Sequence, residues 1–192
     1  HYPQQHFKRR KKVYPVNHQS LRRLVLSALF AALACIATLV IQLHVSPNGY
    51  INLGDCIVLL CGWLLSPVYG AAAAGIGSAM ADILSGYAYY APATLVVKAL
   101  MALFGGMAFR AVSAHGRHRI LAACILSAVI AECIMPGGYY LFEAFVLGLG
   151  PVGALISMPG NTIQALGGGI SGIVVYLLLR RSGALDLLND FS

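Results

Sequence analysis

Residues 24–43 read LVLSALFAALACIATLVIQL, an apolar stretch without a charged side chain. A helix that crosses a bilayer needs about 20 such residues, because the hydrocarbon core is about 30 Å thick. The whole composition agrees: 59% of the residues are hydrophobic, 10% are charged and the mean hydropathy is +0.77. The sequence therefore predicts an all-α, polytopic membrane protein rather than a soluble domain.

Further apolar segments follow, and a chain of 192 residues has room for six spans. The later segments cover residues 56–65, 70–84, 93–107, 120–140 and 152–179. Segment 56–65 is too short for a perpendicular crossing, so we expect it to be tilted, bent or extended at its ends. Segment 70–84 is rich in Gly and Ala, which predicts a packed interior helix with a small-residue face around 75–79.

Basic residues indicate the orientation of the chain, whose formal net charge is +7. They lie before the first span, between the fourth and fifth spans and after the last span: Lys8, Arg9, Arg10, Lys11, Lys12, Arg22, Arg23, Arg110, Arg117, Arg119, Arg180 and Arg181. Cytoplasmic loops are enriched in Lys and Arg, so both termini are expected in the cytoplasm. This placement argues against a nucleic-acid partner. The predicted organisation is a basic tail (1–20), a six-helix membrane domain (21–182) and a cytoplasmic tail (183–192).

Charged residues within spans are candidates for a site, because each costs about 2.5–3.5 kcal/mol on insertion scales. Lys98 and Glu132 lie at comparable depth in the outer halves of two spans and could pair with each other. Such a pair could bind a ligand or lock two helices together. Asn161 and Gln164 stand at i and i+3 and so share a helix face at the same level. A polar site near the outer face is therefore expected.

Aromatic and acidic residues near the outer ends of the spans extend this expectation. Tyr87, Tyr90 and Tyr139 could contact a flat ligand, although tyrosines at this level are commonly an interfacial belt. Asp55 and Asp82 lie beside span boundaries, where they could cap helices or tie down a loop. Pro-Gly sequences at 136–138 and 159–160 are expected to interrupt two spans, either to free backbone groups for a ligand or as packing kinks.

Missing motifs narrow the function. The sequence contains no Gly-x-x-x-x-Gly-Lys-Ser/Thr and no His-Glu-x-x-His, so a P-loop and a zincin-type metal site are absent. All histidines lie outside the apolar segments, which leaves an intramembrane serine without a base. The inner halves of the spans carry few polar side chains, which disfavours a stand-alone facilitator. An intramembrane enzyme and a facilitator remain the rival classes, and no metal is predicted.

Four motifs succeed one another along the chain: GYINLGD at 49–55, SPVYG at 66–70, GIGSAMAD at 75–82 and SGYAYYAPAT at 85–94. With this succession the chain resembles the substrate-binding S-components of energy-coupling factor (ECF) vitamin transporters, over residues 21–182. It looks like the branch associated with hydroxymethylpyrimidine and vitamin B6 compounds, whose members are often labelled riboflavin carriers.

The resemblance implies a non-enzymatic, vitamin-binding subunit in a prokaryotic plasma membrane. It would capture a small aromatic vitamin at its outer face, with vitamin B6 or hydroxymethylpyrimidine favoured and riboflavin as the alternative. Its partners would be a transmembrane coupling subunit and two cytoplasmic ATPase subunits that use ATP, so this chain needs no cofactor. Release inside would follow from toppling of the loaded subunit in the bilayer.

The same resemblance assigns roles to residues. The family's Ala-x-x-x-Ala docking face is matched by Ala28 and Ala32, where small residues would let another helix approach, although lipid packing is an equal reading. Loops 46–55 and 85–92 would act as a lid. Within this scheme the expected ligand contacts are Asn52, Tyr87, Tyr90, Lys98, Glu132, Tyr139, Asn161 and Gln164.

Overall fold

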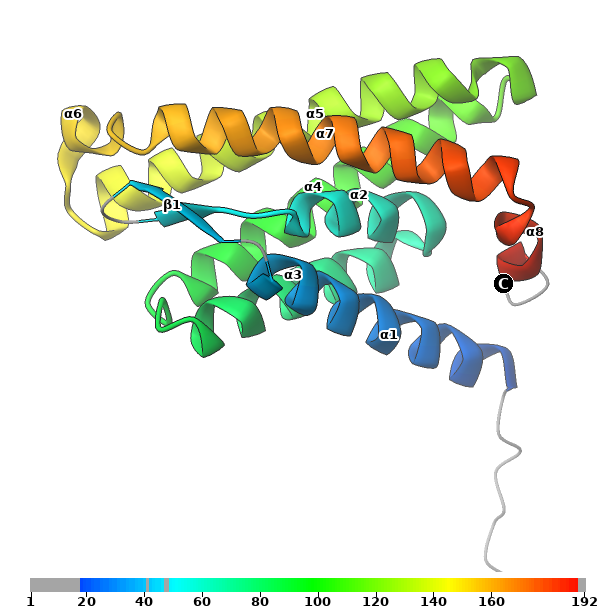
Figure 1. The fold of residues 1–192 in the computed structure, drawn as a ribbon, viewed down its shortest axis with the longest axis horizontal. Coiled ribbons are helices and arrows are strands. Elements are labelled where there is room, and N and C mark those ends of the chain that lie inside the picture. Colours follow the sequence, from blue (N-terminus) through cyan, green and yellow to red (C-terminus); the bar gives the residue numbers. More distant parts are fainter. Residues whose placement is uncertain (1–17, 41, 47–48, 190–192) are drawn as a thin grey trace, which may run out of the picture.

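The structure is a computed structural model that describes residues 18–40, 42–46 and 49–189. It is a helical bundle with one short strand pair (Figure 1). The elements are α1 His18–Val40, β1 Leu43–Ser46, β2 Gly49–Ile51, α2 Gly54–Leu64, α3 Pro67–Leu84, α4 Ala91–Ser113, the 3-10 turn η1 Arg117–Arg119, α5 Ile120–Leu141, the π-helix η2 Phe142–Val146, α6 Gly150–Ala154, α7 Met158–Arg181 and α8 Ala184–Asn189. The tail 1–17, residues 47–48 of the expected lid and residues 190–192 lie outside the described residues.

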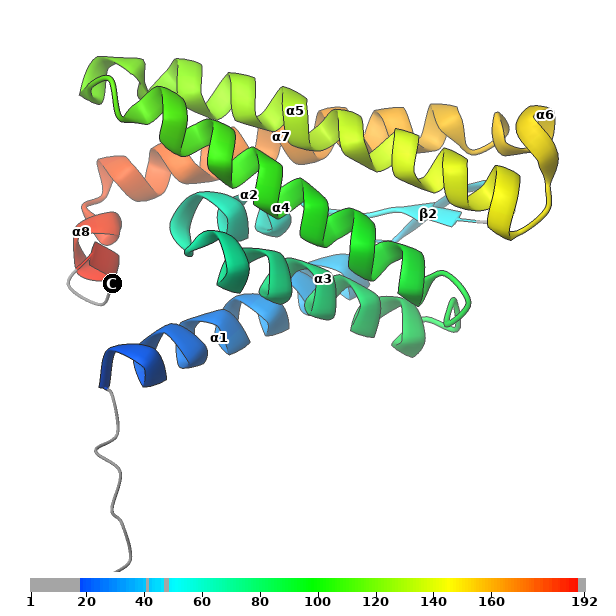
Figure 2. The ribbon, with the colours of Figure 1, turned by 180° about the vertical axis from the view of Figure 1, so that it is seen from behind.

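The bundle has two unlike ends (Figures 1 and 2). One end carries the β1–β2 ribbon, the α3–α4 connection and α6. The other end carries the start of α1, the α4–α5 connection and α8. The basic residues of the described helices, Lys98 excepted, lie on elements at this second end. We call the first the ribbon end and the second the basic end.

Helix α2 lies inside the bundle and contacts α1, α3, α4 and α7. Its Val58, Leu59 and Cys61 are fully buried in the hydrophobic core. The helix has only 11 residues, as the short apolar segment 56–65 leads us to expect. The Arg110 guanidinium donates hydrogen bonds to the carbonyls of Gly62, at 3.1 Å, and Leu65. Because protein surrounds α2 and Arg110 satisfies carbonyls at its end, this helix need not cross the full hydrocarbon layer.

Helix α3 packs through glycines, as its sequence predicts. A Cβ on Gly77 would lie 2.2 Å from the carbonyl oxygen of Ala31 in α1, and one on Gly75 would lie 2.6 Å from that of Leu95 in α4. Any side chain at either position would separate the helices. The opposite face exposes Ile76 and Met80, so α3 is packed on one side only and the interior position expected for it is wrong.

Two parts of the fold differ from the sequence-based expectation. The segment after α1, expected as a loop in an all-α protein, forms an antiparallel ribbon with Leu43 opposite Ile51. Pairing satisfies backbone groups that a loop would leave to solvent. The break expected at 136–138 is absent, because α5 continues through Pro136 to Leu141. Proline has a helical φ, but it cannot donate a hydrogen bond to the carbonyl of Glu132, four residues earlier, and its ring crowds that carbonyl.

The last predicted span, 152–179, is two helices. The short α6 ends at Ala154 and α7 begins at Met158, with Pro159 in the first turn of α7. Proline is well tolerated there, because the first N–H groups of a helix have no intrahelical partner. Pro159-Gly160 therefore marks a helix start.

Within the described residues, four helical segments are long and apolar enough to cross a membrane. They are Gln19–Val40, Ala91–Ser113, Ile120–Val146 and Met158–Arg181. Apolar side chains such as Leu29, Val129 and Ile170 are exposed on them. In water such surfaces would be unfavourable, whereas a bilayer would cover them.

Candidate functional site

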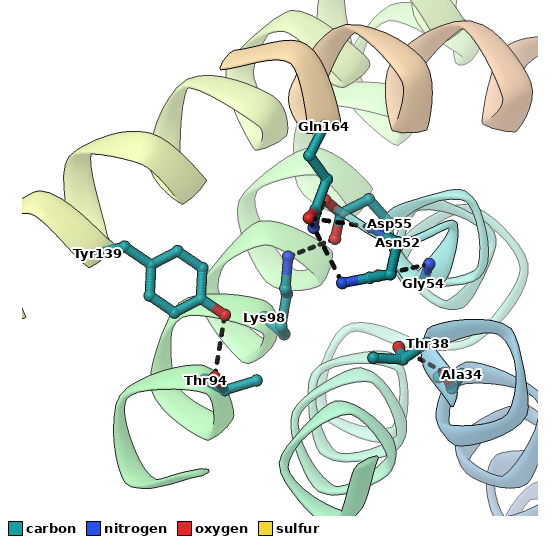
Figure 3. Close-up of polar contacts among 9 residues, drawn as sticks. All are labelled: Ala34, Thr38, Asn52, Gly54, Asp55, Thr94, Lys98, Tyr139 and Gln164. Atoms are coloured by element: carbon teal, nitrogen blue, oxygen red, sulfur yellow. Dashed lines mark hydrogen bonds and ion pairs between the residues drawn. The ribbon is translucent and has the colours of Figure 1, made fainter. Parts of the chain in front are cut away.

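Asp55 is the centre of a buried cluster of polar side chains between the helices. It lies in the first turn of α2, and its side chain is fully buried. The Lys98 ammonium on α4, 4% exposed, donates to its Oδ1 and forms an ion pair with it (Figure 3). The Gln164 amide on α7 donates to Oδ2 at 2.8 Å. Both carboxylate oxygens are thus held by side chains from different helices.

Asn52 ties the residues before α2 to α7. Its backbone N–H and side-chain Nδ2 donate to Gln164 Oε1 at 3.2 and 3.4 Å (Figure 3). Its own Oδ1 accepts a hydrogen bond from the backbone N–H of Gly54 at 2.8 Å. This i to i+2 contact is the local turn that Asn side chains favour, and it brings the chain into α2.

Tyr139 on α5 lies on one side of these polar side chains. Its hydroxyl lies 2.9 Å from the Thr94 hydroxyl, and its ring centroid is 5.6 Å from Lys98 Nζ (Figure 3). A cation over an aromatic face is stabilised by the ring quadrupole. We call Asn52, Asp55, Thr94, Lys98, Tyr139 and Gln164 the Asp55 cluster.

Glu132 on α5 borders this cluster but has a different environment. Its side chain is 7% exposed, and neither carboxylate oxygen has a hydrogen-bond partner among the described residues. It interacts electrostatically with Asp55 and Lys98. On α7, a Cβ at Gly168 would lie 2.9 Å from Glu132 Oε1 and 2.5 Å from Asp55 Cβ. The missing side chain at Gly168 therefore allows both acidic residues to approach the α7 backbone.

A third carboxylate, Glu143 on η2, joins the loops at the ribbon end. It accepts hydrogen bonds from the Tyr90 hydroxyl, at 2.8 Å, and from the Ser157 hydroxyl. All three side chains are buried. Burial, and then the nearby Glu143 carboxylate, raise the pKa of Tyr90 above its ordinary value, so this hydroxyl remains a donor. We call Tyr90, Glu143 and Ser157 the Glu143 joint.

Residues 18–181 match the family described as "ECF-type riboflavin transporter, S component". The chain belongs to this family. It is therefore a component of a transporter and not an enzyme. A Pyrococcus woesei protein described as "Uncharacterized protein in gap 3'region" is 32% identical over 156 residues, which are 78% of this chain and 97% of that protein.

The fold of this S component is also similar to a solved structure. The matching chain comes from work described as "Structure and mechanism of the S component of a bacterial ECF transporter". The TM-score is 0.61 at 17% sequence identity, and the match covers 84% of this chain and 97% of the other. At this identity the likeness concerns the fold, and it agrees with the family assignment.

The structure brings together four of the predicted site residues: Asn52, Lys98, Tyr139 and Gln164. The pair expected between Lys98 and Glu132 is wrong, because the S component pairs Lys98 with Asp55. Asp55 makes this pair from the first turn of α2.

The remaining predicted residues lie beside the Asp55 cluster or away from it. Asn161 is one turn before Gln164 in α7, and no side-chain hydrogen bond within the described residues links it to the cluster. Tyr90 belongs to the Glu143 joint, although its ring centroid is 6.2 Å from that of Tyr139. The ring of Tyr87 packs near that of Tyr89 in the α3–α4 connection, with 6.3 Å between the ring centroids.

Sequence reasoning missed the central position of Asp55 and the parts played by Thr94, Glu143 and Ser157. Asp55 stands at the boundary of a predicted span, and the sequence alone does not distinguish it from Glu132 as the partner of Lys98. Thr94, Glu143 and Ser157 carry no pattern that distinguishes them from other polar residues near loops.

Ala28 and Ala32 are exposed on α1 of this S component. The opposite face of the helix buries Ser27, Phe30 and Ala34 against the bundle. The two alanines therefore lie on a surface that another helix or lipid can reach.

Proposed function

We propose that the Asp55 cluster binds a small aromatic, water-soluble vitamin for an ECF transporter. One observation carries the proposal: α2, α4, α5 and α7 bring a carboxylate, an ammonium, an amide and a phenol into one buried layer. Intramembrane ionisable residues are retained where they serve a substrate or a partner. The expected contacts are Asn52, Lys98, Glu132, Tyr139 and Gln164, with Tyr87, Tyr90 and Asn161 at the border.

We further propose six spans with both termini in the cytoplasm. The gathering of basic residues at one end supports this orientation, because it would place the basic end inside and the ribbon end outside. The enclosed α2 and the packed α3 would be the second and third spans. The described residues of loop 46–55, together with loop 85–92, would then cover the outer face, with the Glu143 joint bracing the second of these loops.

Vitamin B6 compounds or hydroxymethylpyrimidine are the ligands we favour, and riboflavin is the alternative to which the family description points. All three are flat heteroaromatic molecules that could lie against Tyr139 and meet the amide and charged groups of the cluster. The transmembrane coupling subunit would dock on Ala28 and Ala32, and two ATPase subunits would drive toppling in a prokaryotic plasma membrane.

Calorimetry of the purified S component with pyridoxine, hydroxymethylpyrimidine and riboflavin tests the proposal. We expect tight binding of one of them, and a loss of at least about 100-fold in Lys98→Met, because a charged contact and its network are removed. Ser127→Ala is a matched control, since Ser127 is buried in α5 and its hydroxyl bonds within its own helix. Absence of binding to all three vitamins would contradict the proposal.

A further inference from the structure

Glu132 is a buried carboxylate that the protein itself does not satisfy. Its side chain is more than nine-tenths buried, and its two oxygens have no hydrogen-bond partner within the described part of the chain. Burying such an acceptor without a donor costs about 1–3 kcal/mol, and more when it is charged. A group kept in this condition next to a polar cluster is available to a ligand.

In the structure the neighbouring donors are directed at Asp55 and not at Glu132. Lys98 makes its ion pair with Asp55 rather than Glu132, and the Gln164 amide also donates to Asp55. Gly168 leaves no side chain between the carboxylates, since a Cβ there would lie 2.9 Å from Glu132 Oε1. The cluster and Glu132 together present two carboxylates and one ammonium. A ligand that brings a donor or a positive charge favours the ionised form of Glu132, and in that form this layer has one negative charge that nothing in it balances.

A ligand with a hydrogen-bond donor or a positive charge would be favoured here, whereas an anionic ligand would not. An amino group, an N–H or a protonated ring nitrogen would hydrogen-bond the Glu132 carboxylate and reduce its desolvation cost. A phosphate or carboxylate on the ligand would add like charge in a medium of low dielectric constant and be repelled. The site thus distinguishes ligands by their donors and charge as well as by shape.

We propose that Glu132 is a specificity-determining acceptor that selects neutral or cationic heteroaromatic ligands with a hydrogen-bond donor on the ring edge and excludes anionic ones. This inference rests on the proposed function, because it places the ligand at the Asp55 cluster. It adds a criterion that applies equally to a pyrimidine, a pyridine and a flavin ring.

The test uses pairs of ligands that differ in the donor. They are riboflavin and N3-methylriboflavin, hydroxymethylpyrimidine and its 4-dimethylamino analogue, and pyridoxine and 1-deazapyridoxine. For the vitamin that binds, we expect the analogue to bind wild type about 10- to 100-fold more weakly, and this ratio to fall below about 3-fold in Glu132→Leu. Ser127→Ala, in the same helix, should keep the wild-type ratio. Pyridoxal 5′-phosphate should not compete with the bound vitamin.

The outcomes separate the inference from the function on which it rests. If wild type binds a vitamin and Glu132→Leu keeps the full ratio, the donor selection is wrong and the binding function stands. If Glu132→Leu does not fold, the isosteric Glu132→Gln provides the test. The ratio of vitamin affinity to analogue affinity must then fall at least about 3-fold in Glu132→Gln, because a neutral acceptor forms a weaker hydrogen bond than a carboxylate. If wild type binds none of the three vitamins, the proposed function and the inference both fail.

Discussion

Glu132 and Glu143 lie on consecutive helical segments, α5 and η2, and both are buried. Glu143 accepts hydrogen bonds from Tyr90 and Ser157, and these contacts tie three segments of the ribbon end together. Glu132 accepts none within the described residues, although it borders a cluster rich in donors. The same residue type therefore has two roles here. The Glu143 carboxylate stabilises the fold, whereas the Glu132 carboxylate remains available to a ligand.

The largest effect is expected for the ion pair that borders Glu132. Lys98→Met leaves Asp55 buried without its cation, which should lower the free energy of unfolding by about 3–5 kcal/mol. Thermal denaturation in detergent measures this change. The double variant Asp55→Asn/Lys98→Met should regain most of the stability without regaining vitamin binding. Equal instability of the single and double variants would show that the pair is not what stabilises this layer.

Glu143→Gln should have the next largest effect. The substitution keeps the shape but replaces a charged acceptor of two hydrogen bonds, one of which must now meet an NH₂ group. We expect a loss of about 1.5–3 kcal/mol in unfolding free energy. Proteolysis within 142–157 should accelerate in parallel, because Ser157 loses its charged partner. Unchanged stability and proteolysis would contradict the bracing role of the Glu143 joint.

Glu132→Gln, the matched change on α5, should leave the stability of the ligand-free protein unchanged or slightly higher. A neutral amide costs less to bury than a carboxylate without a donor. The same thermal measurement applies to both glutamates. A loss as large as that of Glu143→Gln would mean that Glu132 has a structural partner.

The smallest effect on the isolated protein is expected at the exposed face of α1. Ala28→Leu and Ala32→Leu should leave stability and vitamin affinity within about 0.5 kcal/mol of wild type, because both positions are exposed. Uptake by cells that supply the coupling module should nevertheless be lost, since leucine prevents close helix approach. Normal uptake would rule out docking at this face.

Much of this fold could be predicted from the sequence. The positions of the apolar segments, the short α2 and the small-residue face of α3 follow directly from composition and length. The β1–β2 ribbon could not be predicted from the sequence. Nor could the start of α7 at Met158, because a Pro-Gly sequence serves equally as a kink or a helix start. Pro136 shows the opposite case, since it lies inside a continuous α5.

The candidate site could be predicted in part. Lys98 and Gln164 were identified from polarity and depth, which a single sequence reveals. The partner of Lys98 could not be identified, because Asp55 and Glu132 both lie within reach of its helix and only packing selects between them. That selection leaves the Glu132 carboxylate without a hydrogen-bond partner within the described residues. Neither the spacing of residues nor the composition indicates this.

The most direct test of the account is the stabilisation of Glu132→Gln and Glu143→Gln by the bound vitamin. A ligand that binds the folded state raises the melting temperature according to its affinity. We expect a saturating vitamin to raise the melting temperature of wild type and Glu143→Gln by similar amounts, and that of Glu132→Gln by much less. An undiminished rise in Glu132→Gln, with the rise lost in Glu143→Gln, would contradict it.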